Sequence, residues 1–521
     1  MNNHKSNAIV SDIETTIVPE RSKAYYIITF SSMLATVMQA LDSTIANVAL
    51  PDMQGSLSGT QDQMAWVLTS YIVAAAITIP LTGWLATMVG RKKIFLVSIA
   101  GFVITSIFCG VAETLGEMVL FRFLQGVSGA ALVPLSQSIL FSINRKENYG
   151  KAMALWGVGV TMGPILGPVL GGYLTEDYNW RWVFYINVPI GILAFIGLLL
   201  YLPESETRRS KFDFFGFLTL SIALGTLQIL LDRGQLNDWF NSTEIIAEAI
   251  VSGLGFYLFI IHSLTVEQPF LNTSLFKDRN YTISTILMFI IGIAFFATLA
   301  LLPPMLKEQL NYPVITIGLL TAPRGIGTLL SMLFVGRLVG KIDSRVLIIT
   351  GLIIIVFSLY QMTEYSLLTN MRAIIIPGIV QGFGLGLAYI PLSAVAFSNL
   401  PSHLRDEGTS FFNLMRNLGS SIGISIVEAL LTRNTQIVHA TLATYIMPYN
   451  IENNIAYTAN KVITTTSSGL AALNSMLTDQ AIMIAYIDDY KFIMIVTLAV
   501  IPLVFLLRKI KNTTTESTGI E

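Results

Sequence analysis

The sequence is poor in cysteine, histidine and charged residues. It has one cysteine, Cys109, and four histidines among 521 residues. A single cysteine excludes a structural disulfide within the chain, and no cluster of metal ligands is present, so we predict no metal site. There is no glycine-rich phosphate loop followed by Lys and Ser or Thr, and no pattern resembling a nucleophilic triad. An ATP-driven motor and a hydrolytic enzyme are therefore both disfavoured.

Apolar residues dominate what remains. They make up 53% of the chain, while charged residues make up 12%, against about 25% in a soluble protein. Runs of about 20 apolar residues, long enough to cross a bilayer, recur along the chain. Backbone groups inside a bilayer must satisfy their own hydrogen bonds, and these runs are too long for barrel strands, so we expect helices. We predict an all-α polytopic membrane protein whose fourteen spans lie near 24–50, 63–86, 94–112, 117–141, 149–173, 182–202, 213–232, 243–265, 281–309, 314–335, 346–363, 372–398, 408–431 and 490–507.

The distribution of Lys and Arg predicts the orientation. With the N-terminus in the cytoplasm, 21 of the 31 basic residues fall in cytoplasmic segments and 7 on the opposite side. Cytoplasmic loops of membrane proteins carry such an excess. We therefore expect both termini to be cytoplasmic.

The chain also resembles itself at a distance of 256 residues. Segment 125–136 in the fourth span matches 381–393 in the twelfth, and the glycine pair Gly163 and Gly167 recurs 256 residues later. Paired halves with a site between them near mid-membrane are common in transporters. We expect two six-helix bundles around a central cavity, with spans 7 and 8 inserted and lying outside the cavity wall.

The predicted organisation follows from this repeat. It consists of a cytoplasmic N-terminal tail (1–23), an N-terminal six-helix bundle (24–202), a cytoplasmic linker (203–212), two inserted helices (213–265), a C-terminal six-helix bundle (281–507) with an extracytoplasmic loop (433–489), and a cytoplasmic tail (508–521).

Asp42 is the most informative residue, because it lies deep inside the first apolar span. A carboxylate at that depth costs about 2.5–3.5 kcal/mol and usually faces a protein interior or watery cavity on an ion or proton path. Arg122 lies at a similar depth in span 4, so the two could share a cavity and couple protonation to charge pairing. A structural carboxylate that bonds a backbone group, and a structural arginine, are the alternatives.

Other polar and aromatic residues are candidates for the cavity of a transporter. Arg324, Arg416 and Glu428 are possible secondary charges, although Glu428 is equally consistent with an interfacial carboxylate. Eight further residues are candidates for the cavity wall, and for each of them a role in helix packing or at the membrane interface is the alternative. The candidates for the cavity wall are Gln39, Trp66, Tyr71, Gln125, Trp156, Tyr389, Asn413 and Asn417.

Several motifs occur together along nearly the whole chain. They are 41–51 in the first span, Gly83, Gly90 and Arg91 in the loop after span 2, Arg122 with Gln125 in span 4, Gly163, Pro164, Gly167 and Pro168 in span 5, and 180–191 and 227–234. Jointly they resemble the major facilitator superfamily, and within it the fourteen-span drug:proton antiporters of the EmrB/QacA type, with the EmrB branch closest.

This resemblance implies a major facilitator fold and a secondary active transporter rather than an enzyme. It implies proton-driven export of amphipathic toxic compounds without a cofactor, with Asp42 as proton site and Arg122 as its modulator. It also implies a cell inner membrane location, a periplasmic membrane-fusion adaptor and an outer-membrane channel as partners, and no nucleic acid. Two positions depart from the family pattern: Thr87 replaces the usual loop Asp, and Glu428 has no counterpart.

Two other functions remain open at this stage. One is a dedicated exporter of an endogenous product, such as a siderophore or a fatty acid. The other is a non-transporting membrane receptor or scaffold, which has no need of an embedded Asp42 and Arg122. The segment from Arg433 to Asp489 is too long for an ordinary connection, so we expect it to contain helices that meet a partner or cover the outer cavity.

Overall fold

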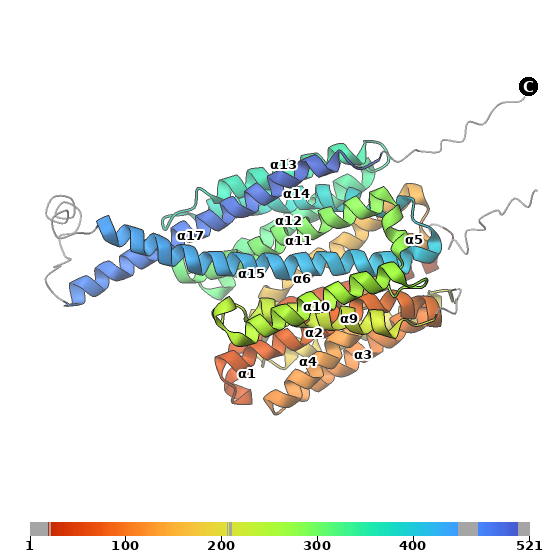
Figure 1. Ribbon diagram of the computed structural model, residues 1–521, viewed down its shortest axis with the longest axis horizontal. Helices are drawn as coiled ribbons and strands as arrows, with labels where there is room; N and C mark the ends of the chain where they lie inside the picture. Colours follow the sequence, from red (N-terminus) through yellow and green to blue (C-terminus); the bar gives the residue numbers. More distant parts are fainter. Residues whose placement is uncertain (1–18, 20–21, 206, 208–210, 446–466, 509–521) are drawn as a thin grey trace, which may run out of the picture.

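The computed structural model describes residues 19, 22–205, 207, 211–445 and 467–508, which are almost entirely helical (Figure 1). The first half comprises α1 (Lys23–Leu57), α2 (Gln61–Val89), α3 (Arg91–Val111), α4 (Leu115–Gly129), α5 (Leu132–Ile143), α6 (Tyr149–Asp177), α7 (Trp182–Tyr185) and α8 (Asn187–Tyr201). Two helices follow, α9 (Phe214–Arg233) and α10 (Thr243–Thr265). The second half comprises α11 (Arg279–Pro304), α12 (Val314–Leu338), α13 (Ser344–Met362), α14 (Met371–Ser398), α15 (Arg405–Tyr445) and α17 (Ser467–Val504).

Side-chain caps set the starts of several helices. Thr60 with Gln63 forms a capping box at α2, and Thr114 with Glu117 forms another at α4. Each box satisfies backbone N–H groups that lack partners inside the helix. α2 and α4 therefore begin close to where the sequence predicted the starts of spans 2 and 4.

Thirteen segments of the described chain are long and apolar enough to cross a membrane. The fourteenth predicted span lies in α17, where Asp488, Asp489 and Lys491 interrupt the apolar run. α17 nevertheless packs beside α11, α13 and α15. The prediction of an all-α chain with fourteen helices is therefore confirmed, with two spans each built from consecutive helices: α4 with α5, and α7 with α8.

The helices form two halves with matching packing. α1 packs on α6 and α2 on α4 in the first half, as α11 packs on α15 and α12 on α14 in the second. Gly163 of α6 lies so close to α1 that an added Cβ would meet the Ala40 carbonyl carbon at 2.3 Å. Gly419 of α15 lies equally close to α11, with the Phe289 carbonyl oxygen 2.0 Å from such a Cβ. The sequence repeat therefore corresponds to equivalent close helix contacts in the two halves.

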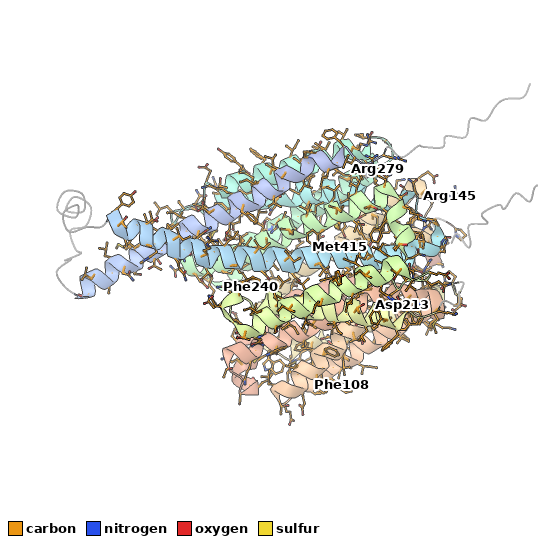
Figure 2. The ribbon with its side chains drawn as sticks, in the orientation of Figure 1. Phe108, Arg145, Asp213, Phe240, Arg279 and Met415 are labelled. Atoms are coloured by element: carbon orange, nitrogen blue, oxygen red, sulfur yellow. The ribbon has the colours of Figure 1, made fainter. Side chains whose placement is uncertain are left out.

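The two halves meet along two seams. α6 packs against α12, and α2 packs against α15. α9 lies against both α2 and α15, and α10 packs mainly on α9, so the inserted pair covers the second seam (Figure 1). Figure 2 places Asp213, at the start of α9, towards the same end of the bundle as Arg145 and Arg279, and Phe240 of the α9–α10 connection at the other end.

The segment 433–489, which we expected to contain helices outside the bundle, is helical in the part that the structure describes. α15 continues to Tyr445 and α17 begins at Ser467, and both project past the bundle (Figure 1, left). His439 and Asn474 form a hydrogen bond of 3.2 Å between these projections. The segments contain no Gly or Pro from 424 to 447 or from 470 to 501, so polar composition alone does not end the helices. We call 433–445 and 467–489 the helical extension; residues 446–466 of the predicted loop lie outside the described residues.

Candidate functional site

An ion pair connects α1 to α4 inside the first half. Arg122 Nη1 lies 2.6 Å from Asp42 Oδ2. The Arg122 side chain is 1% exposed and that of Asp42 is 0% exposed. The predicted proximity of the two residues is confirmed, and the pair is sealed from solvent.

Neighbouring amides complete the hydrogen bonding of the carboxylate. Gln125 Nε2 donates to Asp42 Oδ1 at 3.0 Å, and Asn187 Nδ2 donates to the same oxygen at 2.9 Å. Arg122 also donates to Gln125 Oε1 at 2.8 Å and to the Val67 carbonyl at 3.1 Å. Every hydrogen bond to Asp42 thus treats its carboxyl group as an acceptor, which suits an ionised carboxylate.

Tyr71 separates the pair from the space between the halves. The Arg122 guanidinium carbon lies 4.3 Å from the centroid of the Tyr71 ring. Gln39 Nε2 donates to the Tyr71 hydroxyl at 3.2 Å. The expectation that Asp42 and Arg122 face the cavity is therefore corrected: Gln39 and Tyr71 face it, and the pair lies behind them.

A cavity of about 370 Å³ lies between the halves. Gln39, Tyr71, Tyr389 and Asn417 lie in its wall, together with Arg416. Its remaining lining is mainly apolar and comes mostly from α1, α2, α6, α11 and α15, and it includes Phe295 and Phe296. The cavity has the size and apolar character of a small-molecule site.

Four of the predicted wall residues lie elsewhere. Gln125 is buried beneath Asp42. Trp156 is fully buried behind Tyr389, with their ring centroids 6.2 Å apart. Asn413 is buried, and Trp66 lies under Arg233, whose guanidinium carbon is 5.4 Å from the ring centroid. Neither the rotation of these helices about their axes nor the neighbours of each side chain could be predicted from the sequence.

α9 reaches the cavity, contrary to the expectation that both inserted spans lie outside its wall. Gln228 of α9 is part of the lining. The Ser425 hydroxyl donates to the Leu231 carbonyl at 2.8 Å, and Thr69 donates to the Asp232 carboxylate, so α9 is bonded to both α15 and α2. Because α9 lies between helices of opposite halves, its Gln228 side chain forms part of the cavity wall.

The second half has a related polar group without the carboxylate. Thr298, located 256 residues after Asp42, accepts a hydrogen bond of 3.2 Å from Gln381, located 256 residues after Gln125. Arg324 is buried nearby, stacked on Phe295 with its guanidinium carbon 4.5 Å from the ring centroid. Arg324 does not line the cavity, and its Nε and Nη1 atoms have no partner among the described residues. Among the described residues, a buried ion pair of this kind therefore occurs in the first half and not in the second.

The loop residues of the family motif close one end of the space between the halves. Arg91 Nε lies 2.7 Å from Asp406 Oδ1, at the start of α15. Ser138 also donates to the Asp406 carboxylate, and the Thr82 and Ser410 hydroxyls lie 2.8 Å apart. We call this set the closed-end contacts.

Two glycines of the motif adopt positions at this end that a larger residue would block or strain. A Cβ on Gly83 would meet Glu407 Cα at 2.7 Å, so α2 and α15 touch there through backbone. Gly90 has φ of 103°, a region that L side chains rarely adopt, and the N–H of the next residue, Arg91, bonds the Ser205 hydroxyl. The expected loop motif is thus an interface between halves.

Other motif residues serve close packing or lie at the edge of the site. A Cβ on Gly167 would lie 2.1 Å from Thr44 Oγ1, which keeps α6 against α1. Pro168 lies in α6, while the side chain of Pro164 is outside the described part of the chain. Glu428 is exposed on α15 and does not line the cavity.

Two functional candidates were missed from the sequence. Asn187 belongs to a quoted family motif, and its position at the start of α8 directs it to Asp42. Asp406 had a weaker signal: an acidic pair directly before span 13, on the same predicted side as the basic loop containing Arg91.

The chain is similar to known membrane transporters. The Major Facilitator Superfamily profile matches residues 32–424 and 284–506. "Multidrug export protein EmrB" of Escherichia coli (strain K12) is 40% identical over 428 residues, covering 81% of this chain and 83% of that protein. "Fatty acid resistance protein FarB" of Neisseria gonorrhoeae is 35% identical over 492 residues, covering 94% and 97%.

Solved structures share the fold at low sequence identity. The proton:xylose symporter XylE aligns with a TM-score of 0.58 and 13% identity, over 90% of this chain and 95% of that one. The human organic anion transporter MFSD10 aligns with a TM-score of 0.57 and 12% identity, over 91% and 98%. These two likenesses establish the arrangement of helices alone.

Proposed function

The chain belongs to the major facilitator superfamily, and from this premise we propose that it is a proton-coupled antiporter that exports amphipathic toxic compounds. As a member of this family it is a secondary transporter and not an enzyme, and it needs no cofactor. The observation that carries the proposal is the sealed Asp42–Arg122 pair directly behind a cavity large enough for a small molecule.

Protonation of Asp42 is the proposed coupling step. Neutralising the carboxylate would leave the guanidinium of Arg122 buried without a counter-charge, which costs about 3–5 kcal/mol when a buried pair is broken. The helices that carry the pair must therefore rearrange to give Arg122 water or a new partner. This links the arrival of one proton to a change in the contact between α1 and α4.

The cavity communicates with the pair through Tyr71. Its ring stacks on Arg122, while its hydroxyl is held by Gln39 of the cavity wall. A substrate that displaces Tyr71 removes the ring that packs against Arg122. Conversely, movement of Arg122 away from Asp42 alters the position of Tyr71 in the cavity wall. Proton and substrate thus compete for one arrangement of the same side chains, which is what antiport requires.

The gradient can supply enough free energy for export. One proton moving through 100 mV gains about 2.3 kcal/mol, and each pH unit adds about 1.36 kcal/mol. Together these would sustain a substrate gradient of a few hundredfold at about 1.4 kcal/mol per tenfold. No second energy source is needed.

Transport in proteoliposomes tests the proposal. Purified protein is reconstituted, and a panel of amphipathic dyes is followed with an imposed pH gradient, without one, and with a proton ionophore. We expect gradient-dependent movement that the ionophore abolishes. Movement unaffected by the ionophore, or none for any compound, would contradict proton-coupled export.

A dedicated exporter of one endogenous product is the second candidate. A relative of 35% identity carries the name fatty acid resistance protein, which favours a long-chain carboxylic acid over a siderophore. Competition decides between the two: a broad exporter is inhibited by chemically unrelated amphiphiles, whereas a dedicated exporter is inhibited only by analogues of its product.

We further propose that the protein is the inner-membrane pump of a tripartite system, with both termini cytoplasmic. The helical extension supports docking of a periplasmic adaptor, because it projects past the bundle and exposes Ile437, Tyr445, Leu470 and Met476. A lid formed by the extension over the outer cavity is the competing interpretation.

Co-purification with a candidate adaptor tests the docking. Deleting 441–473, or replacing both Ile437 and Met476 with Asp, is expected to reduce association while leaving the bundle folded. Leu236→Asp is the matched control, because Leu236 is equally exposed in the α9–α10 connection. Undiminished association of the deletion variant would remove the support for docking.

A further inference from the structure

The described cavity wall carries positive charge and no negative charge. Among the described residues that line the cavity, Arg416 of α15 alone carries a charge. Asp42 lies behind Tyr71 and is fully buried, already paired with Arg122. A ligand in the cavity would therefore face one cationic side chain and no carboxylate among the described residues.

Arg416 keeps hydrogen-bonding capacity for a ligand. Its Nη1 donates to the Tyr389 hydroxyl and its Nη2 to Asn417 Oδ1, both at 3.3 Å, which is at the long end for hydrogen bonds. Its Nε is buried without a partner, and no ion pair to Arg416 is present among the described residues. A guanidinium in a mostly apolar space without a carboxylate partner has lost hydration and gained no counter-charge.

Apolar surface lies within the same cavity. Phe295, Phe296 and Leu299 of α11 form part of the wall, with Ile72 of α2. A ligand with one polar end and one apolar body can place the polar end at Arg416 and bury its body against these side chains. The planar guanidinium matches a carboxylate through two parallel hydrogen bonds.

We propose that Arg416 is a binding site for the carboxylate of amphipathic organic anions, and that it makes the cavity select anionic over cationic amphiphiles. This inference rests on the proposed export function, because it assigns the charge of the exported compound. Tyr389 and Asn417 hold the guanidinium in place until the ligand arrives. A cationic amphiphile would meet Arg416 with like charge in a low-dielectric space.

Equilibrium binding tests the proposal without any proton gradient. Full-length protein in lipid nanodiscs is titrated with radiolabelled dodecanoate, with empty nanodiscs subtracted, and dodecanol and dodecyltrimethylammonium serve as neutral and cationic probes of equal chain length. We expect dodecanoate to bind most tightly. Arg416→Gln should weaken dodecanoate about 10- to 100-fold, the range of a charge-assisted hydrogen bond, and leave dodecanol unchanged.

Two further variants keep the test decisive. Asn417→Asp places a carboxylate beside Arg416 without changing size, so it should also weaken dodecanoate and spare dodecanol. Arg433→Gln removes an exposed arginine of the same helix outside the cavity and should change neither. Equal weakening of both ligands by Arg416→Gln, an unchanged dodecanoate affinity, or no dodecanoate binding to the wild type overturns the inference. Binding with the expected pattern but no gradient-driven transport would instead refute the proposed function.

Discussion

Neutralising Asp406 should open the end of the bundle that the closed-end contacts hold shut. The Arg91 and Asp406 side chains are 18% and 7% exposed, so their ion pair is only partly screened by water. Asp406→Asn keeps an oxygen that can accept from Ser138 but removes the charge. A hydrogen bond to a charged group contributes about 1.5–3 kcal/mol, and the partial exposure of Arg91 favours the lower part of that range. At about 2 kcal/mol the open population should rise about 30-fold.

A reporter cysteine measures this population. Thr82 is 2% exposed and faces Ser410 across the interface, so Thr82→Cys is labelled by a hydrophilic maleimide only when this end opens. The chain's own Cys109 is fully buried and provides the background rate. We expect labelling of Thr82→Cys to be about 30-fold faster when Asp406→Asn is added, because the rate follows the open fraction.

Two comparisons make the result specific to the ion pair. Arg91→Gln should accelerate labelling similarly, and the double variant should add little, because both changes remove one interaction. Arg145→Gln, which removes an exposed charge at the same end, should have no effect (Figure 2). An unchanged labelling rate in Asp406→Asn, or full additivity of the two variants, would refute the assignment of the pair as the closing contact.

Two other predictions concern packing and a helix start. Gly167→Ala should destabilise the protein by about 1–3 kcal/mol, because its Cβ would meet Thr44 Oγ1 at 2.1 Å. Gly172→Ala should be tolerated, because a Cβ there meets nothing within 4 Å. Thermal unfolding measures both variants, and partial recovery of Gly167→Ala by Thr44→Ala identifies the clash. At the start of α9, burial acts to raise the pKa of Asp213, but hydrogen bonds from backbone N–H groups and from His262 outweigh it and lower the pKa overall. Asp213→Asn should therefore lower the unfolding temperature at pH 7, and its difference from the wild type should shrink as the pH falls through the lowered pKa; a difference independent of pH would contradict this assignment.

Depth along a helix was predictable from the sequence, and this is why the pairing of Asp42 with Arg122 was found. Both lie at a similar depth in their spans, and a buried charge needs a partner. Rotation about the helix axis was not predictable, because a polar side chain of a membrane helix can face either a cavity or the polar groups of a neighbouring helix. Gln125 and Asn413 were therefore expected in the cavity wall, although both are buried in hydrogen-bonded contacts with other side chains.

Contacts between the two halves could also not be predicted from the sequence. Asp406 and Arg91 are 315 residues apart and come together only when the halves dock. The end of span 13 and the start of span 14 differ from the prediction for another reason: hydropathy indicates where a helix leaves the membrane and not where it ends. The repeat, in contrast, predicted both bundles because glycines at close helix contacts recur at a fixed distance.

Transport by Asp42→Asn tests the central claim most directly. The substitution preserves size and removes titration, and Asp42→Glu serves as the variant that keeps a carboxylate. In inside-out vesicles, Asp42→Asn should still exchange labelled substrate across the membrane without a gradient, while accumulation driven by a pH gradient should fall to the level of empty vesicles. Normal pH-driven accumulation by Asp42→Asn would contradict the account that coupling runs through this carboxylate and its pair with Arg122.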